Sequence, residues 1–317
     1  MPYSFALIWA WWYIAPRHMK AISETWNILV AALDKNDSVG IIDSHFPQAD
    51  FFTEFEIFDR HLEKLKRNGK KIDYVSICTP NYLHDAHMRF ALRIWAHAIC
   101  EKPLVLNPWN IDALQEIEKE SDKKVYTILQ LRLHPVIKQL KEQIDKEKKQ
   151  KNWKYTVDLC YITPRGKWYD VSWKGNISKS GGIATNIWVH FFDMLSRIFG
   201  NVEKNTVNVL DDHKAAWYLE LEHANVRWFL SIDAKDLPKE VVEKKQKSYR
   251  SILIEWKELE FSEWFTDLHT ESYREILAWR GFGLEDSKNS IQIVHDIRNQ
   301  KPVWLVWEYH PFLKNNT

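Results

Sequence analysis

The first 130 residues alternate apolar runs of strand length with segments of helical periodicity, and this alternation constrains the fold most. Strands are predicted at 5–10, 28–34, 74–80, 96–103 and 124–132, a short extended piece at 49–55, and helices at 15–25, 38–46, 58–69, 82–94 and 108–121. Strands that are apolar throughout and separated by helices form parallel sheets covered on both faces. The sequence therefore predicts an α/β fold with a doubly wound, dinucleotide-binding type of domain over residues 1–122.

The pattern changes after a helix that ends in a Lys-rich run at 133–151. The segments 155–162, 215–233 and 249–262 alternate with period two or pair across short turns, as antiparallel strands do. Helices are predicted at 186–199 and 270–282. Residues 123–317 are thus expected to form a domain of the α+β class, with a large, mainly antiparallel sheet.

Charge and cysteine content exclude several classes of protein. Lys and Arg number 44 against 43 Asp and Glu, so the net charge of +1 favours neither nucleic acid nor an anionic membrane as partner. No apolar run reaches the roughly 18 residues of a membrane span, and no secretion signal is recognisable, which predicts a cytoplasmic protein. Cys78, Cys100 and Cys160 are widely spaced, so we expect buried thiols and no metal site.

Glycine is scarce and tryptophan abundant. Average usage would give roughly 22 glycines in a chain of this length, whereas there are 9 glycines and 17 tryptophans. The loop between the first strand and the first helix of a dinucleotide site needs glycine for its tight turn and for the approach of the pyrophosphate. Here Trp9, Trp11 and Trp12 occupy that loop, followed by Tyr13 and Ile14. These five residues are the predicted cofactor loop.

Tryptophan stands at other glycine-like positions. Glu255-Trp256 joins two alternating strands where a two-residue turn favours Asn-Gly or Asp-Gly. Trp26 and Trp95 follow helices, where a left-handed glycine cap is common. Similar contexts surround Trp188, Trp264, Trp279, Trp304 and Trp307. We interpret the pattern as replacement of glycine by tryptophan relative to a functional parent; the alternative is that these are ordinary core or surface aromatics.

Several polar residues lie where such a fold places its chemistry. Asp34 ends the second strand, 22 residues after Trp12, and is placed to accept ribose hydroxyls. Lys102 lies at the carboxyl end of a predicted parallel strand. His190 follows Asn186 by four residues, so both would share one face of a helix. A histidine can accept a proton and a lysine can stabilise a developing alkoxide, so His190 and Lys102 are candidate catalytic residues.

Three motifs give the chain a resemblance to a known family. They are "CTPNYLH" at 78–84, "AICEKPL" at 98–104 and "SGGIATNIWVHFFD" at 180–193. The chain resembles the Gfo/Idh/MocA oxidoreductases along essentially its whole length. Within that family it is similar to the UDP-N-acetyl-glucosaminuronate 3-dehydrogenases of surface-polysaccharide (lipopolysaccharide or O-antigen) pathways. The cofactor loop departs from the family, whose glycines would fall at positions 9 and 12, and Asn186 stands where a carboxylate is frequent.

The resemblance implies further site residues. It implies an NAD cofactor, a UDP-sugar substrate and a homodimer or homotetramer, with residues 123–317 as the substrate-binding and oligomerisation domain. The implied nicotinamide-side contacts are Thr79, Asn81 and His84, with Glu101 near the ribose and ring. The implied substrate contacts are Arg165, Tyr169, Trp173 and Lys174 for a diphosphate or carboxylate, with Gln130 and Arg132 lining the cleft and Asn186 and His190 at the reacting sugar. Basic and planar side chains suit anionic nucleotide sugars.

Three hypotheses follow. The first is an NAD-dependent sugar-nucleotide dehydrogenase with an atypical loop. The second is a catalytically silent variant of the same fold, whose cofactor cleft is blocked by the indoles of Trp9, Trp11 and Trp12. The third is that the chain as written is altered at its tryptophan positions. His84 and His87 resemble a metal pair, but without a third ligand at suitable spacing we interpret them as helix-surface residues.

Overall fold

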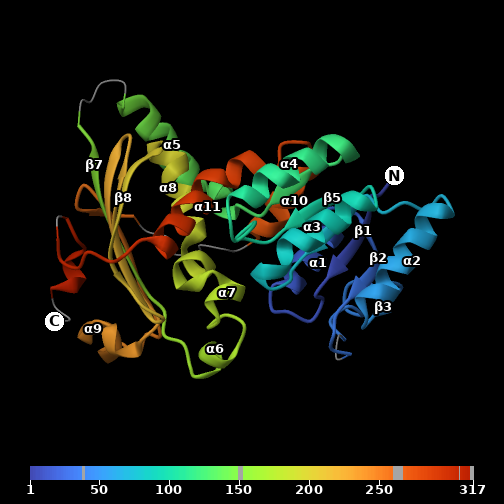
Figure 1. Ribbon diagram of the computed structural model, residues 1–317, viewed down its shortest axis with the longest axis horizontal. Coiled ribbons are helices and arrows are strands. Elements are labelled where there is room, and N and C mark those ends of the chain that lie inside the picture. Colours follow the sequence, from blue (N-terminus) through green and yellow to red (C-terminus); the bar gives the residue numbers. More distant parts are fainter. Residues whose placement is uncertain (38–39, 149–152, 260–266, 307, 315–317) are drawn as a thin grey trace. The chain divides into compact units, whose positions relative to one another are not determined.

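The computed structural model describes residues 1–37, 40–148, 153–259, 267–306 and 308–314. The chain divides into two compact units, each described by itself (Figure 1). The first comprises Met1–Leu133 and Phe265–Lys288, and the second comprises His134–Trp264 and Asn289–Thr317. The boundary predicted after residue 122 differs from this division, because the strand that follows it pairs with the N-terminal sheet. A segment distant in sequence, 265–288, also belongs to the first unit.

The first unit is built on a six-stranded sheet of order β3-β2-β1-β4-β5-β6, and every pairing is parallel. Its strands are β1 Ser4–Ile8, β2 Ile28–Leu33, β3 Asp50–Phe52, β4 Tyr74–Ile77, β5 His97–Cys100 and β6 Val125–Thr127. Side chains of β4 and β5 are buried throughout. Strands buried on both faces explain the unbroken apolar runs of the sequence. The predicted doubly wound sheet is confirmed.

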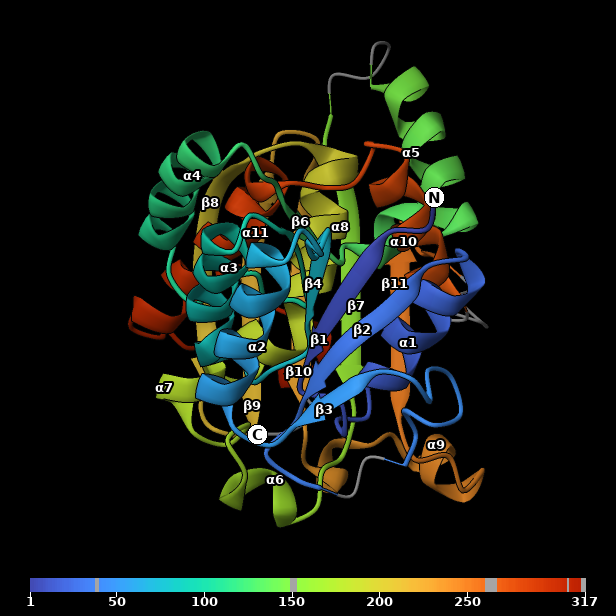
Figure 2. The ribbon, with the colours of Figure 1, turned by 90° about the vertical axis from the view of Figure 1, so that its right-hand side faces the viewer.

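Helices cover both faces of this sheet. They are α1 Ala15–Glu24, α2 Phe55–Arg67, α3 His84–Arg93, α4 Trp109–Ser121 and α10 Leu268–Leu277, with short helices η1 Asn81–Leu83 and η2 Gln130–Leu133. Figure 2 shows α2, α3 and α4 on one side of the strands and α1 and α10 on the other. Helix α10, predicted for the second domain, instead packs on α1. Residues 40–46 form consecutive turns in place of the helix predicted at 38–46, of which 38 and 39 lie outside the described residues.

The second unit contains a sheet of order β12-β11-β7-β10-β9-β8. Its strands are β7 Tyr155–Ile162, β8 Val202–Leu210, β9 Lys214–Leu221, β10 Ala224–Ser231, β11 Tyr249–Ile254 and β12 Lys257–Glu258. All pairings are antiparallel except the parallel pair β7–β10. The mainly antiparallel sheet expected from the period-two pattern is therefore confirmed, whereas β8 had no clear alternation in the sequence.

The helices of this unit include one with an unusual start. They are α5 Pro135–Glu147, α6 Trp168–Val171, α7 Ile177–Ser180, α8 Val189–Phe199 and α9 Lys239–Glu243, with η4 Ala234–Asp236 and η5 Pro311–Leu313; α11, Leu284–Asn299, continues from the first unit into the second. A π-helical turn, η3 Ala184–Trp188, precedes α8. Helix α11 was not predicted. In the described part of the chain, no helix is both long and apolar enough to cross a membrane.

Tryptophans build the core between α8 and the sheet. Trp188, Trp217 and Trp228 are fully buried, and the rings of Trp188 and Trp228 have centroids 4.3 Å apart. Phe192 lies beside Trp228 at 4.7 Å. Trp188 does not have the left-handed backbone that favours glycine, since its φ is −103°, and its indole is packed among other aromatic rings. Trp264 and Trp307 lie outside the described residues.

Candidate active site

The turn after β1 has the backbone conformation that favours glycine. Trp9 has a φ of +76°, and its N–H donates to the carbonyl of Leu33 at 2.7 Å. A β-carbon in this left-handed region costs roughly 1–2 kcal/mol. Trp11 and Trp12 do not share the conformation. The predicted glycine requirement is therefore confirmed for Trp9 and not for its neighbours.

The side chains of this loop point to different surroundings. Trp9 and Trp12 pack against the hydrophobic core of the unit, and the Lys35 ammonium lies 5.2 Å from the Trp9 ring centroid. Trp11 and Tyr13 are exposed. Ile14 is buried at the N-terminus of α1, which has no side-chain cap. An uncapped helix N-terminus after a left-handed turn is the backbone arrangement that binds phosphate.

Asp34 lies at the end of β2 and is fully buried. One carboxylate oxygen accepts from the N–H of Trp11 at 2.7 Å, and the other accepts from the backbone N–H of Asn36 at 2.9 Å. The predicted ribose-binding carboxylate therefore holds the loop itself in this structure. A ribose hydroxyl would have to share or replace these contacts.

Two neighbouring strand ends are joined by a histidine. His84 is fully buried, with Nδ1 2.7 Å from the carbonyl oxygen of Pro103 and Nε2 2.8 Å from that of Thr79. The Thr79 hydroxyl lies 3.2 Å from Nδ1 of His87, whose pKa burial lowers to about 4. Asn81 is also buried, at the start of η1. His84 thus acts by fixing the segments after β4 and β5, and is not exposed toward a ligand.

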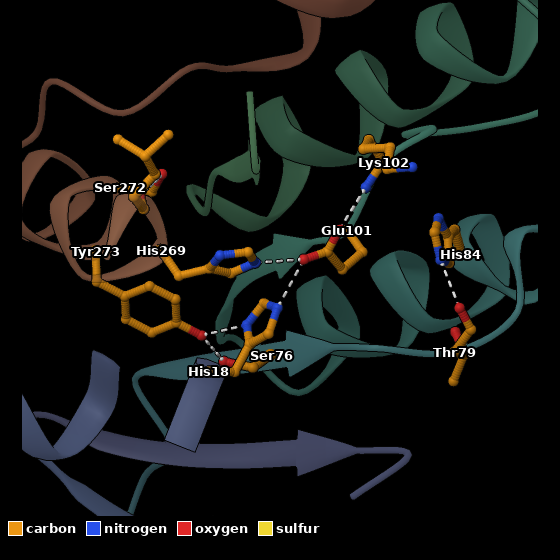
Figure 3. Close-up of polar contacts among 10 residues, drawn as sticks. His18, Ser76, Thr79, His84, Glu101, Lys102, His269, Ser272 and Tyr273 are labelled. Carbon is orange, nitrogen blue, oxygen red and sulfur yellow. Dashed lines mark hydrogen bonds and ion pairs between the residues drawn. The ribbon is translucent and has the colours of Figure 1, made fainter. Parts of the chain in front are cut away.

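Glu101 and Lys102 follow β5 at its carboxyl end, and the Lys102–Pro103 peptide is cis. The Glu101 carboxylate is directed toward two histidines (Figure 3), with Oε1 3.0 Å from His18 Nε2 and 2.8 Å from His269 Nε2. Burial alone would raise the pKa of Glu101, but the hydrogen bonds from His18 and His269 outweigh it and hold that pKa well below its usual range. A buried anion therefore lies directly beside Lys102 in the chain.

Gln130 and Arg132 lie in η2 of the same unit. Gln130 is buried. The Arg132 guanidinium donates to the Asp286 side chain at 2.6 Å and to its carbonyl at 2.7 Å, and it lies over the Phe282 ring. These contacts tie the end of β6 to the start of α11.

Asn186 and His190 belong to the second unit. Asn186 lies in the π-helical turn and donates from Nδ2 to the Tyr169 hydroxyl at 3.3 Å. His190 is the second residue of α8 and is 7% exposed. Burial raises the pKa of Tyr169, so its hydroxyl stays protonated near neutral pH. The π-helical turn breaks the regular helix on which the shared face of Asn186 and His190 was predicted.

A cavity of about 200 Å³ lies beside this segment within the second unit. Its polar lining includes Tyr169, Lys174, Asp211, Asp212 and Arg298. The Lys174 ammonium lies 5.5 Å from the Trp168 ring centroid and 5.8 Å from that of Trp173. Arg165, on the loop before α6, is exposed. The cavity combines two cations, two carboxylates and apolar walls, a lining that suits a polar ligand.

Comparison with known proteins identifies the family. Residues 13–128 match the model described as the Gfo/Idh/MocA oxidoreductase family, NAD-binding Rossmann fold, and residues 141–242 match that family's C-terminal alpha/beta domain. The chain belongs to the Gfo/Idh/MocA oxidoreductase family. The predicted resemblance, the Rossmann domain and the oxidoreductase class are therefore confirmed.

Solved structures extend the similarity over the whole chain. The WlbA (WbpB) dehydrogenase from Thermus thermophilus, in complex with NAD and alpha-ketoglutarate, is 47% identical, with a TM-score of 0.93 over 98% of this chain and 99% of that one. The same dehydrogenase in complex with NAD and UDP-GlcNAcA is 46% identical, with the same TM-score and coverage. Myo-inositol 2-dehydrogenase from Thermotoga maritima is 28% identical over 129 residues, 41% of this chain and 36% of that curated protein.

The family's two domains correspond to the two sets of predicted site residues. Lys102, Glu101, Asp34 and the Trp9 loop lie in the Rossmann unit. Asn186, His190, Tyr169 and Lys174 lie in the C-terminal unit. Within the first set, the strand ends bring Thr79, Glu101 and Lys102 to one edge of the sheet (Figure 3).

Sequence reasoning missed functional candidates in both units. His18, His269 and Tyr273 surround Glu101, although 83 and 168 residues separate Glu101 from the two histidines. His18 offers one signal, a histidine in the helix that follows the cofactor loop. Asp211, Asp212 and Arg298 line the cavity of the second unit and were not among the predicted site residues.

Proposed function

We propose that this protein is an NAD-dependent dehydrogenase that oxidises the sugar 3-hydroxyl of a UDP-N-acetylated hexuronic acid in surface-polysaccharide biosynthesis. The observation that carries the proposal is the 46% identity, over 98% of this chain, to a dehydrogenase solved with NAD and UDP-GlcNAcA. Similarity of this extent favours the dehydrogenase over the silent variant. We also infer a cytoplasmic homodimer or homotetramer, an expectation that size-exclusion chromatography with light scattering would check.

The backbone of the Rossmann unit fits an NAD site, whereas one side chain, that of Trp9, fits it less well. The left-handed turn at Trp9, the uncapped start of α1 and the carboxylate of Asp34 are the expected parts of such a site. The Trp9 indole stands where glycine would let the pyrophosphate approach. When bound, NAD would supply the acceptor for the hydride that leaves the sugar carbon. We therefore expect binding that is weaker than a glycine loop would allow.

The residues of this chain supply the remaining chemistry. Lys102 is the proposed cation that orients the hydroxyl and stabilises the developing alkoxide. His190 is the proposed acceptor of the hydroxyl proton, because the amide of Asn186 cannot accept one. Asn186 and Tyr169 would hold the sugar through their polar side chains. Arg165, Trp173 and Lys174 would contact the diphosphate or carboxylate, and Gln130 and Arg132 are proposed as further substrate contacts.

A direct assay tests the proposal. The full chain is incubated with NAD and UDP-GlcNAcA, and NADH formation is followed by absorbance together with mass spectrometry of the sugar product. The expected product is the 3-keto sugar nucleotide, two hydrogen atoms lighter than the substrate. UDP-GlcNAc, which lacks the carboxylate, is the matched control substrate. Oxidation at another carbon, or equal activity on the control, would contradict the proposed substrate.

A further inference from the structure

Glu101 and four other side chains form a buried hydrogen-bonded cluster that none of the proposed roles uses. His18 comes from α1, Ser76 from β4, and His269 and Tyr273 from α10 (Figure 3). All five residues are at most 8% exposed. Three elements far apart in the sequence thus converge on the residue that precedes Lys102.

The distances determine how the protons are arranged. An ionised carboxylate only accepts hydrogen bonds, so Nε2 of both His18 and His269 must carry the proton that reaches Glu101 Oε1. Nδ1 of His18 is then an acceptor, and it lies 2.8 Å from the Tyr273 hydroxyl. That hydroxyl in turn accepts from the Ser76 hydroxyl at 2.6 Å. One consistent set of donors therefore runs from Ser76 to Glu101.

The same three groups could hold a metal ion, since their ligand atoms all lie within 4.8 Å of one another. The geometry favours hydrogen bonds. Ligand atoms about 2.0–2.1 Å from a tetrahedral zinc lie about 3.3 Å apart, whereas both histidine contacts to Glu101 Oε1 have hydrogen-bond lengths. Metal-bound histidines donate their second N–H to a partner, and Nδ1 of His269 has no hydrogen-bond partner among the described residues.

We propose that His18 and His269 are positioning residues: as Nε2–H donors they hold Glu101 as a fixed, buried anion beside Lys102, where it favours the oxidised cofactor. We call the contacts of His18 and His269 with the Glu101 carboxylate the Glu101 clamp. The backbone N–H of Lys102 lies 3.3 Å from the second oxygen of that carboxylate, which links the clamp to the proposed catalytic lysine. The part of the proposal that concerns the cofactor rests on the proposed function.

The expected effect follows from charge. Ligands of open α/β sheets bind at the carboxyl ends of the strands, and Glu101 follows β5 at that edge. The nicotinamide ring is cationic in NAD⁺ and neutral in NADH, so a nearby buried anion stabilises NAD⁺ selectively. A purely structural role for Glu101 would affect the binding of both forms equally.

The first test needs no cofactor. Nitrogen-15 NMR of the histidine side chains in the full chain reports which ring nitrogen carries the proton. His18 and His269 are expected as Nε2–H tautomers at pH 7. His213, whose Nε2 lies 3.0 Å from Asp170 at the exposed surface, is the control whose ring proton exchanges with water. Nδ1–H tautomers, or signals that shift on addition of one equivalent of Zn²⁺, would overturn the clamp.

The second test removes the charge or one donor. Glu101→Gln keeps an acceptor oxygen for both histidines but carries no charge, so the ratio of the NADH to the NAD⁺ dissociation constant should fall by on the order of tenfold. His269→Gln keeps a donor near the position of Nε2 and should retain the ratio of the parent. His269→Leu removes that donor and should lower the ratio as Glu101→Gln does. The ratio is measured by calorimetry in the Trp9→Gly background.

The outcomes separate the clamp from the dehydrogenase. An unchanged ratio in Glu101→Gln would overturn the electrostatic role, even if both affinities decreased. If His269→Gln lowered the ratio as much as His269→Leu does, a hydrogen-bond donor at position 269 would not determine the ratio, and the proposal would be contradicted. Absence of cofactor binding in every variant would contradict the proposed function and the proposed preference for NAD⁺. The nitrogen-15 spectra would still test whether His18 and His269 donate hydrogen bonds to Glu101.

Discussion

The end of α2 and the ends of α1, α3 and α10 have the same backbone but different residues. Gly69, after α2, has a φ of +74°, and the next N–H, that of Lys70, donates to the carbonyl five residues earlier at 2.9 Å. Trp26, Trp95 and Trp279 occupy the equivalent positions, with φ values of +60°, +65° and +61°. The residues after them make the same five-residue bonds, at 3.0, 2.9 and 2.8 Å. All four helices end in the same capping motif, which normally selects glycine.

The comparison shows why tryptophan is compatible with this fold. At the helix ends the indoles of Trp26, Trp95 and Trp279 point to solvent, being 87%, 62% and 61% exposed. The strain of a β-carbon is then a local cost, and helix packing retains the motif. Trp9 has the same left-handed backbone, but its indole lies at the proposed cofactor turn. Tryptophan at a glycine-like position is therefore expected to affect mainly stability at the three helix ends and ligand binding at position 9.

The largest effect should appear when the catalytic residues are removed from a protein whose turn admits the cofactor. In the Trp9→Gly background, Lys102→Ala or His190→Ala should lower kcat by on the order of 10²–10⁴, because each removes a charge-stabilising or proton-accepting group. Steady-state NADH formation measures this loss. Lys71→Ala, which removes an exposed lysine paired with Asp73, is the control and should retain activity. Full activity in either catalytic variant would exclude that residue from the mechanism.

The next effect isolates the cofactor turn from the helix ends. Trp9→Gly should tighten NAD binding by on the order of tenfold or more, because the indole no longer occupies the approach of the pyrophosphate; the backbone strain at position 9 is present with and without the cofactor and does not contribute. Calorimetry with NAD measures the dissociation constant. Trp26→Gly relieves the same strain away from the turn and should leave the affinity unchanged.

Equal tightening in both variants would mean that general stability controls binding, and the comparison would fail. Micromolar NAD affinity in the original chain would show that the indole at position 9 does not hinder the cofactor. Intact mass of each purified protein must accompany these measurements, because it distinguishes tryptophan from glycine at every position concerned.

Smaller effects are expected on stability at the helix ends. Trp26→Gly and Trp279→Gly should each raise the free energy of unfolding by about 1 kcal/mol, the strain removed less the added entropy of the unfolded glycine. Trp95→Gly should gain less, because the Lys66 ammonium lies 3.6 Å from the Trp95 ring centroid and that contact is lost. Gly69→Trp should lower stability by a similar amount. Urea unfolding measures all four, and stabilisation by Gly69→Trp would contradict the argument.

The same residues show how far sequence could predict this molecule. Apolar periodicity located the strands, and the glycine deficit located left-handed positions such as Trp9, Trp95 and Trp256, because both signals are local. Trp188 differs from them, because its φ is −103° and only tertiary packing reveals that its indole enters an aromatic core. His269 and α10 were assigned to the wrong unit because a contact across 168 residues leaves no local pattern. Lys102 was singled out because it follows a predicted strand, whereas no local pattern indicated that His18 and His269 contact Glu101.

The smallest effect concerns pH and the contact between Trp279 and His97. The two rings meet edge to face at 5.3 Å, and burial lowers the pKa of His97 to about 4. Between pH 6.5 and 4 the unfolded state therefore binds a proton on His97 that the folded state does not, so this histidine makes the free energy of unfolding fall as the pH decreases.

Trp279→Gly uncovers the His97 ring, and the pKa of His97 should rise toward 6.5. The loss between pH 7 and pH 5 decreases by up to about 1.4 kcal/mol for each unit by which this pKa rises above 5. Urea unfolding at pH 7 and pH 5 measures this difference, with Trp26→Gly as the variant that leaves His97 covered. An identical acid-induced loss in the two variants would mean that the indole at position 279 contributes nothing to its surroundings beyond backbone strain.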